Sequence, residues 1–238
     1  MDTQYKSIFT PAKKHTLADD VAVRIRDAIF AGQLSPGEQI SEEALARSLN
    51  VSRGPIREAL SQLEHEGLII IRDNRRRFVA RLSREDLEEV YGLRTALELL
   101  AVREALRHAG PIELAEMQAI VDKMMVDSDA GMTAKQAAEF DINFHDALCR
   151  ASRNKRLYQF WSDLHQQIQI VLLSRNVANE DFREHVVSSH QSILDAICEK
   201  NEDRAIALMQ THLQASYNRI ISSYDQPVVN DAGKAQLQ

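Results

Sequence analysis

A carboxylate and three histidines in the second half of the chain have the types and positions of a metal site. Asp141 and His145 are four residues apart in a helical pattern, so both side chains lie on one helix face. A carboxylate and an imidazole one turn apart can bind the same metal ion. His190 and His212 lie in two later helical stretches, each on a largely apolar face, where an unpartnered imidazole would be costly. A lone inward histidine is more often a hydrogen-bonded core residue, but three of them with an aspartate favour a metal site.

A second set of candidates lies between Val51 and Ile69, where a short helix is predicted to begin at Ser52. The Ser52 hydroxyl can cap this helix by accepting a hydrogen bond from a backbone N–H two or three residues on. Arg53 and Arg57 are four residues apart, so both project from one face near the helix start. The opposite face is an apolar stripe of Ile56, Leu60 and Leu63. Such a helix either enters the major groove of DNA or is a surface helix with solvated arginines.

The segments before this helix favour DNA binding. Apolar residues recur every four positions and predict an amphipathic helix that ends at Gly32; they are Leu17, Val21, Ile25 and Ile29. Ser41 is expected to cap a second helix, which has acidic residues in its first turn. Residues 50–52 then form the tight turn of a helix-turn-helix.

The segments after the helix predict a wing. Residues 68–71 are a short apolar, β-branched run typical of a strand, and residues 78–80 form the returning strand. The charged turn between them places Arg75, Arg76 and Arg77 at the tip of a two-stranded wing. Arginines there can contact phosphates or enter the adjacent minor groove; the alternative is a solvated hairpin tip.

Residues 17–80 resemble the winged helix-turn-helix of the GntR family of bacterial transcription regulators. The matching segments are Gly32–Gly37, Ser41-Glu42, Leu45-Ala46, Val51–Arg53, Pro55–Leu60, Leu63-Glu64 and Glu66–Leu68. The resemblance implies that Arg53 and Arg57 contact DNA, and that Ser52 and Gly54 lie close to the DNA backbone or to base edges. The wing of that family usually reads Asn-Arg-Gly, whereas Arg76 follows Asn74-Arg75 here. Either Asn74 supplies the positive φ that the glycine normally gives, or the wing bends differently.

From Ser83 onward the pattern is helical throughout, and the connections are short. Six helices are expected, at about 83–108, 112–128, 133–152, 154–175, 180–200 and 202–224. Helices joined in this way form an antiparallel bundle. The predicted fold is therefore mainly α, with an N-terminal winged helix-turn-helix and a C-terminal all-helical bundle.

The bundle resembles the metal-containing ligand-binding (FCD-type) domain of the FadR subfamily. The matching segments are Leu93-Arg94, Leu97-Glu98, Asp141 with Phe144-His145, His190 with Ile193, Ala196 and Ile197, and His212-Leu213. The resemblance implies that Asp141, His145, His190 and His212 bind a divalent metal whose coordination a carboxylate effector completes. Three imidazoles and one carboxylate suit Zn²⁺ or Ni²⁺. Arg94 is a candidate for binding the effector carboxylate, because its planar fork matches that group, and Arg175 is a weaker one.

The formal net charge of −6 argues by itself against a DNA-binding protein, but the charge is unevenly distributed. Residues 51–81 carry seven arginines and four acidic side chains, whereas residues 81–238 carry 17 basic and 24 acidic ones. The positive charge is thus local to the proposed DNA face.

The two cysteines, Cys149 and Cys198, lie in helical patterns, so we expect both to be reduced and buried, as in a cytoplasmic protein. No signal peptide or twenty-residue apolar run is recognised. The expected organisation is a flexible arm (1–16), a DNA-binding domain (17–80), an effector-binding, metal-binding and dimerising domain (81–225) and a flexible tail (226–238).

Three functions are compatible with these residues. The first is a homodimeric transcription regulator whose binding to palindromic double-stranded operator DNA is controlled by a small organic-acid or sugar-acid effector. The second is a DNA-binding regulator with a purely structural metal. The third, a metal-dependent hydrolase, is disfavoured because the sequence holds no clear nucleophile or general-base motif and because hydrolysis leaves residues 17–80 unexplained. We therefore expect no enzyme activity.

Overall fold

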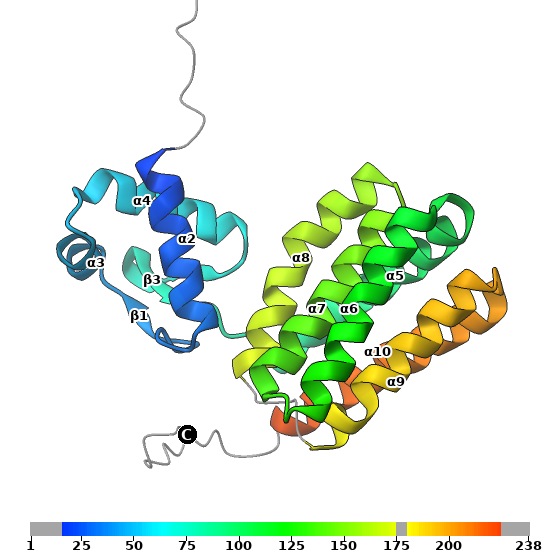
Figure 1. Cartoon of the computed structure of the whole chain (residues 1–238). Helices are drawn as coiled ribbons and strands as arrows, with labels where there is room; N and C mark the ends of the chain where they lie inside the picture. Colours follow the sequence, from blue (N-terminus) through cyan, green and yellow to red (C-terminus); the bar gives the residue numbers. More distant parts are fainter. Residues whose placement is uncertain (1–15, 175–179, 225–238) are drawn as a thin grey trace, which may run out of the picture.

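The computed structural model describes residues 16–174 and 180–224, which form a small winged part beside a larger helical bundle (Figure 1). The tail, Arg175 and all of the expected arm except Thr16 lie outside the described residues. Each part has its own hydrophobic core. None of the described helices is both long and apolar enough to cross a membrane.

Three helices build the winged part: α2 (Leu17–Phe30), α3 (Glu42–Leu49) and α4 (Arg53–His65). The first two of these helices begin at a hydroxyl cap. The Thr16 hydroxyl accepts a hydrogen bond from the Asp19 N–H, and the Ser41 hydroxyl accepts one from the Ala44 N–H. Asn50 ends α3 in the left-handed conformation, with φ of 52°. The tight turn of the predicted helix-turn-helix therefore lies at the expected place.

The wing belongs to a three-stranded antiparallel sheet rather than to an isolated pair of strands. Its strands are β1 (Gln39–Ile40), β2 (Ile69–Arg72) and β3 (Arg76–Val79), in the order β1-β3-β2. The third strand was not predicted, because two residues are too few to show an alternating pattern. A single 3₁₀ turn, η1 (Asp73–Arg75), joins β2 to β3.

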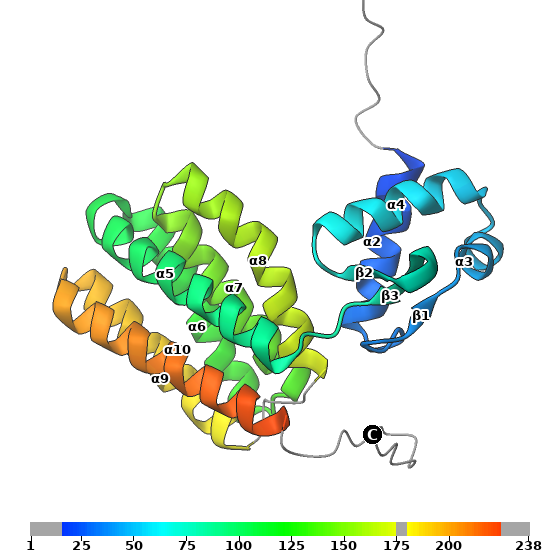
Figure 2. The same cartoon turned by 180° about the vertical axis from the view of Figure 1, so that it is seen from behind.

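Six helices of the described chain form the bundle, as predicted: α5 (Arg84–His108), α6 (Pro111–Asp129), α7 (Ala134–Ala151), α8 (Lys155–Ser174), α9 (Glu180–Cys198) and α10 (Glu202–Tyr224). The Ser83 hydroxyl and the Asp86 carboxylate start α5 with a reciprocal capping box. Figure 2 shows α5 on an outer face of the bundle, between α8 and α10. Only four residues separate the end of β3 from the start of α5, so the covalent link between the wing and the bundle is short.

Helix α8 also connects the two parts. The Ile170 side chain, which is 4 % exposed, belongs to the hydrophobic core of the winged part together with residues of α2 and α4. Three residues earlier, the Gln167 side chain lies against Gly67, and a Cβ built on that glycine would come within 2.5 Å of Gln167 Nε2. The winged part therefore rests on α8 as well as on its covalent link to α5.

Leu17, the first residue of the apolar pattern in α2, is half exposed, whereas Val21, Ile25 and Ile29 are buried as an amphipathic helix requires. One burial prediction is wrong. Cys198 is exposed, because it is the last residue of α9, whereas Cys149 is buried inside α7.

Candidate nucleic-acid interface and metal centre

The start of α4 presents the two predicted arginines to solvent. Arg57 Nε donates to Glu42 Oε2 at 2.8 Å, and an Arg53 guanidinium nitrogen lies 3.2 Å from Glu43 Oε2. Both acids lie in the first turn of α3. Helix α3 therefore orients the exposed arginines of the helix that follows it.

Ser52 occupies the N-cap position of α4 with an extended backbone, at φ of −70° and ψ of 166°. Its hydroxyl makes no capping hydrogen bond with the described residues, so the predicted cap bond is wrong. Ser52 and Gly54 are both exposed beside Arg53. The first turn of α4 thus offers backbone N–H groups and a hydroxyl on the same surface as the arginines, which suits phosphate binding.

The three wing arginines do not share one environment. Arg75 and Arg76 are exposed, whereas Arg77 lies in β3, is part-buried and donates to Glu42 Oε1. Both Asn74 (φ 64°) and Arg75 (φ 57°) adopt the left-handed conformation. Two residues in succession therefore make the sharp turn for which the related family uses a glycine.

Glu42 joins α4 to the wing, because one of its carboxylate oxygens accepts from Arg57 and the other from Arg77. The hydrogen bond from Arg57 lowers the pKa of Glu42 against the effect of burial, with further lowering by Arg77. Surface ion pairs of this kind contribute only about 0–1 kcal/mol. A DNA phosphate can therefore replace the Glu42 carboxylate as the partner of Arg57.

The structure brings the four predicted metal ligands together inside the bundle. Asp141 and His145 project from α7, His190 from α9 and His212 from α10, and all four are buried. One ligand atom from each lies within 4.8 Å of the others. Asp141 Oδ1 is 3.7, 3.4 and 3.5 Å from the Nε2 atoms of His145, His190 and His212, respectively.

These separations fit a single metal ion. Ligand atoms bound at about 2.0–2.2 Å to one ion lie roughly 3 to 4.4 Å from each other, depending on the coordination geometry. The His145 and His212 Nε2 atoms are 3.0 Å apart. Within the described residues, Asp141 Oδ1 and His190 Nε2 are buried without a hydrogen-bond partner, which is costly unless a cation binds there.

Two of the histidines are oriented by groups behind them. His145 Nδ1 lies against the Glu98 carboxylate, and His190 Nδ1 against the Val186 carbonyl oxygen. Such partners direct Nε2 toward a metal and make it a better ligand. The sequence analysis named Glu98 only within a segment that matches the FadR-type domain and gave it no role, because the sequence does not show that Glu98 faces His145.

The local charges prepare the site for a cation. Burial alone would raise the pKa of Asp141, but the charge of His145 and the nearby ring nitrogens of the three histidines hold this pKa well below its usual range. Burial, with repulsion from His190 and His145, lowers the pKa of His212 to about 3 against the effect of Asp141. An ionised Asp141 and a neutral His212 are the forms that bind metals, whereas Glu98 raises the pKa of His145 against the effect of burial, so a metal has to displace a proton from His145.

Arg94, the predicted effector-binding residue, is fully buried beside this cluster. Its guanidinium donates to Glu98 Oε1 at 2.7 Å, to the Tyr91 hydroxyl at 3.1 Å and to Asp141 Oδ2 at 3.4 Å. These contacts use three of the five N–H donors of an arginine. Arg94 thus holds Asp141 in place and retains two donors.

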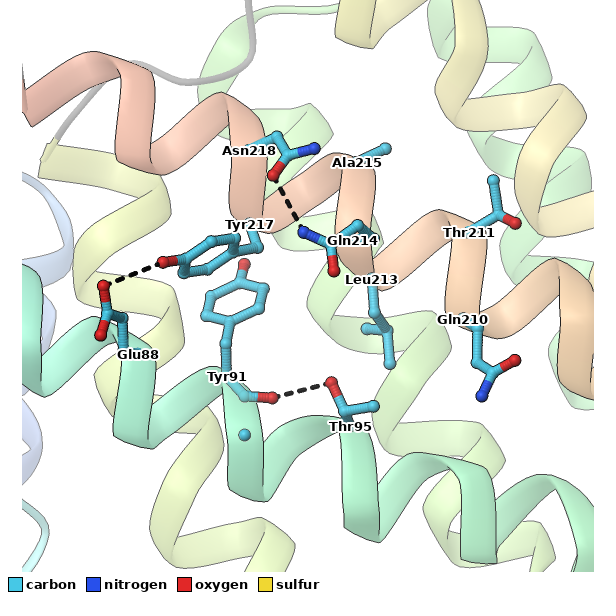
Figure 3. A pocket seen from close by; sticks show the side chains of 11 residues that line it. Glu88, Tyr91, Thr95, Gln210, Thr211, Leu213, Gln214, Ala215, Tyr217 and Asn218 are labelled. Carbon is cyan, nitrogen blue, oxygen red and sulfur yellow. Dashed lines mark hydrogen bonds between the residues drawn. The ribbon is translucent and has the colours of Figure 1, made fainter.

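An open groove lies between α5 and α10 (Figure 3). Tyr91 lines it, and the Tyr91 ring lies beside the Tyr217 ring, with centroids 5.6 Å apart. The surface of the groove is more apolar than polar, but its lining also includes the polar side chains of Glu88, Thr95 and Gln214. The Tyr91 hydroxyl contacts Arg94, which in turn contacts Asp141, so these two side chains link the groove to the Asp141 cluster.

Family models match both parts of the chain. Residues 17–79 match the bacterial regulatory proteins of the gntR family, and residues 89–215 match the FCD domain. The chain belongs to the GntR family of DNA-binding transcription regulators. This family and the relatives of the chain are transcription regulators and not enzymes, as the sequence analysis expected.

Individual relatives extend over most of this GntR-family chain. It is 30 % identical over 222 residues to the gluconate operon transcriptional repressor of Bacillus licheniformis, covering 88 % of both chains. It is 28 % identical to YdhC of Bacillus subtilis, an uncharacterized HTH-type transcriptional regulator, covering 82 % of this chain and 85 % of YdhC. Among solved structures, Escherichia coli McbR/YncC shares the fold with a TM-score of 0.75 and 23 % identity, over 88 % of this chain and 99 % of that one.

Proposed function

We propose that this GntR-family regulator is a cytoplasmic homodimer whose affinity for a palindromic operator is set by a small carboxylate effector bound at a divalent metal. The observation that carries the proposal is the convergence of Asp141, His145, His190 and His212 on one buried point, with two of their ligand atoms unpartnered. Zn²⁺ or Ni²⁺ fits this donor set. A divalent ion held there supplies an open coordination position for a carboxylate.

The residues near the Asp141 cluster indicate the chemical class of the effector. Arg94 lies beside Asp141 with two unused donors and can bind a carboxylate that reaches the site. The groove beside Tyr91 carries hydroxyl, amide and carboxylate side chains, among them Thr95 and Gln214, that can form hydrogen bonds with a hydroxylated small molecule. The relative from Bacillus licheniformis is named for the gluconate operon, and gluconate combines both chemical features. Sugar acids are therefore the first effectors to test.

The same contacts provide a route from effector to DNA. Arg94 and Glu98 lie on α5, whose first residue follows the wing closely. An effector that changes how Arg94 binds Asp141 or Glu98 acts on α5 and therefore on the position of the wing. For two winged parts on one operator, such a shift changes the half-site spacing that the dimer can reach.

Metal analysis tests the ligand set. Protein purified without chelator is expected to contain about one equivalent of divalent metal, and His190→Ala is expected to lose most of it. The control is His185→Ala, which changes an exposed histidine on the same helix. Equal metal contents in the two variants and the wild type would show that these residues do not hold the ion.

Thermal shift then tests the effector. Gluconate and related sugar acids should raise the melting temperature of metal-loaded protein by mass action, and sorbitol, which lacks the carboxylate, should not. A purely structural metal predicts stabilisation by the metal and none by any acid. An equal rise in the melting temperature of metal-free protein would show that the acid binds without the metal.

DNA binding is tested with an operator selected from a random pool. Arg53→Ala and Arg57→Ala should abolish sequence-specific binding while the bundle stays folded, because they remove the side chains expected to contact DNA. Arg204→Ala, an exposed arginine at the start of α10, is the matched control. Unchanged operator affinity in the α4 variants would remove the recognition role of this helix.

A further inference from the structure

The surface around the start of α4 carries an acidic side chain as well as arginines. Glu43 lies in the first turn of α3, and its side chain is 57 % exposed. Arg47 Nη1 donates to Glu43 Oε1 at 2.7 Å, and Arg53 Nη2 lies 3.2 Å from Glu43 Oε2. Both views show α3 on the side of the winged part that is farthest from the bundle (Figures 1 and 2). An acid is thus exposed beside an arginine that we expect to contact DNA.

Glu43 has a different environment from its neighbour Glu42. Consecutive residues point about 100° apart around a helix axis. Glu42 contacts Arg57 and Arg77, and its side chain is only 27 % exposed. The two ion pairs of Glu43 lie at the surface, where such pairs are weak. The Glu43 carboxylate is therefore available to a further partner.

The chemistry of DNA limits what that partner can be. An ionised carboxylate only accepts hydrogen bonds, and the backbone phosphates offer it none. In the major groove the donors are the amino groups of cytosine, at N4, and of adenine, at N6. An acid on a DNA-binding surface therefore repels the backbone at every sequence and gains a direct partner only where an amino group faces it. Glu43 should for this reason affect sequence preference as well as general affinity.

Arg53 and Glu43 together match the edge of one kind of base pair. In the major groove a G·C pair presents two acceptors, guanine N7 and O6, followed by one donor, cytosine N4. An arginine can donate to both guanine acceptors, and a glutamate can accept from cytosine N4. The two head groups lie side by side, so they offer donors and an acceptor in the same order. An A·T pair would instead set thymine O4, an acceptor, against the carboxylate.

Both side chains retain the capacity for this contact. The ion pair engages one nitrogen of the Arg53 guanidinium, and an arginine has five N–H donors. A carboxylate has about four lone-pair sites, of which the two arginines engage one on each oxygen. Arg47 lies one turn further along α3 and holds Oε1, which fixes the direction of the carboxylate. Glu43 can therefore accept from a base without releasing either arginine.

We propose that Arg53 and Glu43 together read one G·C base pair of the operator, with Arg53 on guanine and Glu43 on the cytosine amino group. The inference rests on the recognition role of Arg53 in the proposed function and adds Glu43 as a second specificity-determining residue. Removing the Glu43 carboxylate then has two effects. Discrimination is lost at the base pair that Arg53 reads, and DNA without an operator is bound more tightly because a negative charge beside the phosphates is gone.

A base-pair scan of the operator selected from a random pool tests the assignment. Each position of one half-site is changed in turn, and fluorescence anisotropy gives the affinities of the wild type, Arg53→Lys and Glu43→Ala. Arg53→Lys keeps the charge but loses the planar fork. For the wild type, changing the proposed G·C pair to A·T should cost about tenfold or more in affinity. Both variants should lose most of this discrimination at the same pair and keep it at the others.

A modified base isolates the contact of Glu43. 2-Pyrimidinone in place of cytosine lacks only the N4 amino group. It should weaken binding by the wild type about tenfold, as expected for a hydrogen bond to a charged group, whereas Glu43→Ala should bind both operators nearly equally. The matched control is Asp20→Ala, because Asp20 pairs with Arg24 on α2 at the same spacing as Glu43 with Arg47. This variant should behave like the wild type, and circular dichroism verifies that each variant is folded.

The outcomes separate this inference from the proposed function. If Glu43→Ala keeps wild-type discrimination at every base pair, whatever its overall affinity, Glu43 acts through its charge alone and the inference is overturned. Lost discrimination at a pair that Arg53→Lys still distinguishes would also overturn the joint reading. In both cases the proposed regulator stands. A random pool that yields no preferred sequence for the wild type would overturn the proposed operator recognition and this inference with it.

Discussion

Glu98 on α5 lies against His145 Nδ1 on α7, and both side chains are fully buried. The carboxylate also accepts a hydrogen bond from Arg94, so its two oxygens serve two different partners. Burial by itself would raise the pKa of Glu98, but His145 and Arg94 lower it below its usual value. An ionised carboxylate at this position fixes the orientation of the His145 ring and directs Nε2 into the cluster.

The first prediction concerns this carboxylate. Glu98→Gln keeps the shape of the side chain but removes the charge behind His145. Metal affinity should fall by about 10- to 100-fold, as is usual when such a supporting group is changed. Competition with a chromophoric chelator measures the affinity. The control is Glu104→Gln, six residues later on α5, whose side chain pairs with Arg107 at the surface; this variant should bind metal like the wild type. A wild-type metal affinity in Glu98→Gln would show that His145 does not need the Glu98 carboxylate.

The contrast between His145 and Glu98 shows what the sequence can predict of this site. The clustering of the four candidate ligands was predictable because each is a polar residue on an otherwise apolar helix face, and because a known domain has the same residues. Glu98 was not, since Arg94 four residues earlier supplies a local partner. Only the packing of α5 against α7 shows that this pair is buried and that its second oxygen contacts His145.

The fold was predictable to a similar degree. Six long helices with caps and clear breaks follow from periodicity, as does the helix-turn-helix. The two-residue strand β1 did not follow, because its pairing with Phe78 and Arg77 depends on tertiary contacts. The hydrogen bond predicted for the Ser52 hydroxyl is likewise absent. Ser52 has the backbone conformation expected of an N-cap residue, but the sequence does not determine where its hydroxyl points.

The second prediction separates phosphate contacts from base contacts. Arg76 is exposed on β3, away from the Glu42 cluster that holds Arg57 and Arg77. Arg76→Ala should weaken binding to all DNA sequences alike and reduce the slope of log K against log salt concentration by about 1. Arg57→Ala should instead lose the preference for the operator. Fluorescence anisotropy at several salt concentrations distinguishes these effects, and a loss of sequence preference in Arg76→Ala would assign it to base recognition.

The third prediction concerns the wing turn. Arg75 has φ of 57°, a conformation that costs most L-residues roughly 1–2 kcal/mol. Arg75→Gly should therefore stabilise the winged part by about 1 kcal/mol, less the entropy that glycine loses on folding. Hydrogen exchange of the β2 and β3 amides measures this.

The neighbouring residue provides the comparison. Asn74→Gly should change the exchange much less, because asparagine tolerates the left-handed conformation. Faster exchange in Arg75→Gly than in the wild type would show that contacts of the arginine side chain outweigh the backbone cost.

The fourth prediction concerns the contact between the two parts of the molecule. Ile170 and Leu172 are two residues apart on α8 and both are buried, but Ile170 packs into the core of the winged part and Leu172 into the core of the bundle. Ile170→Ala should weaken the docking of the winged part by about 2 kcal/mol or more. Amides of α2 and of the end of α4 should then exchange faster, while those of the bundle keep their wild-type rates.

Leu172→Ala is the matched control, with a similar loss of volume on the same helix. It should speed exchange in the bundle and leave the winged part docked. If α8 transmits effector binding to DNA, Ile170→Ala should also reduce the effect of the effector on operator affinity without changing metal content. A full effector response in Ile170→Ala would assign the transmission to the short link between β3 and α5 alone.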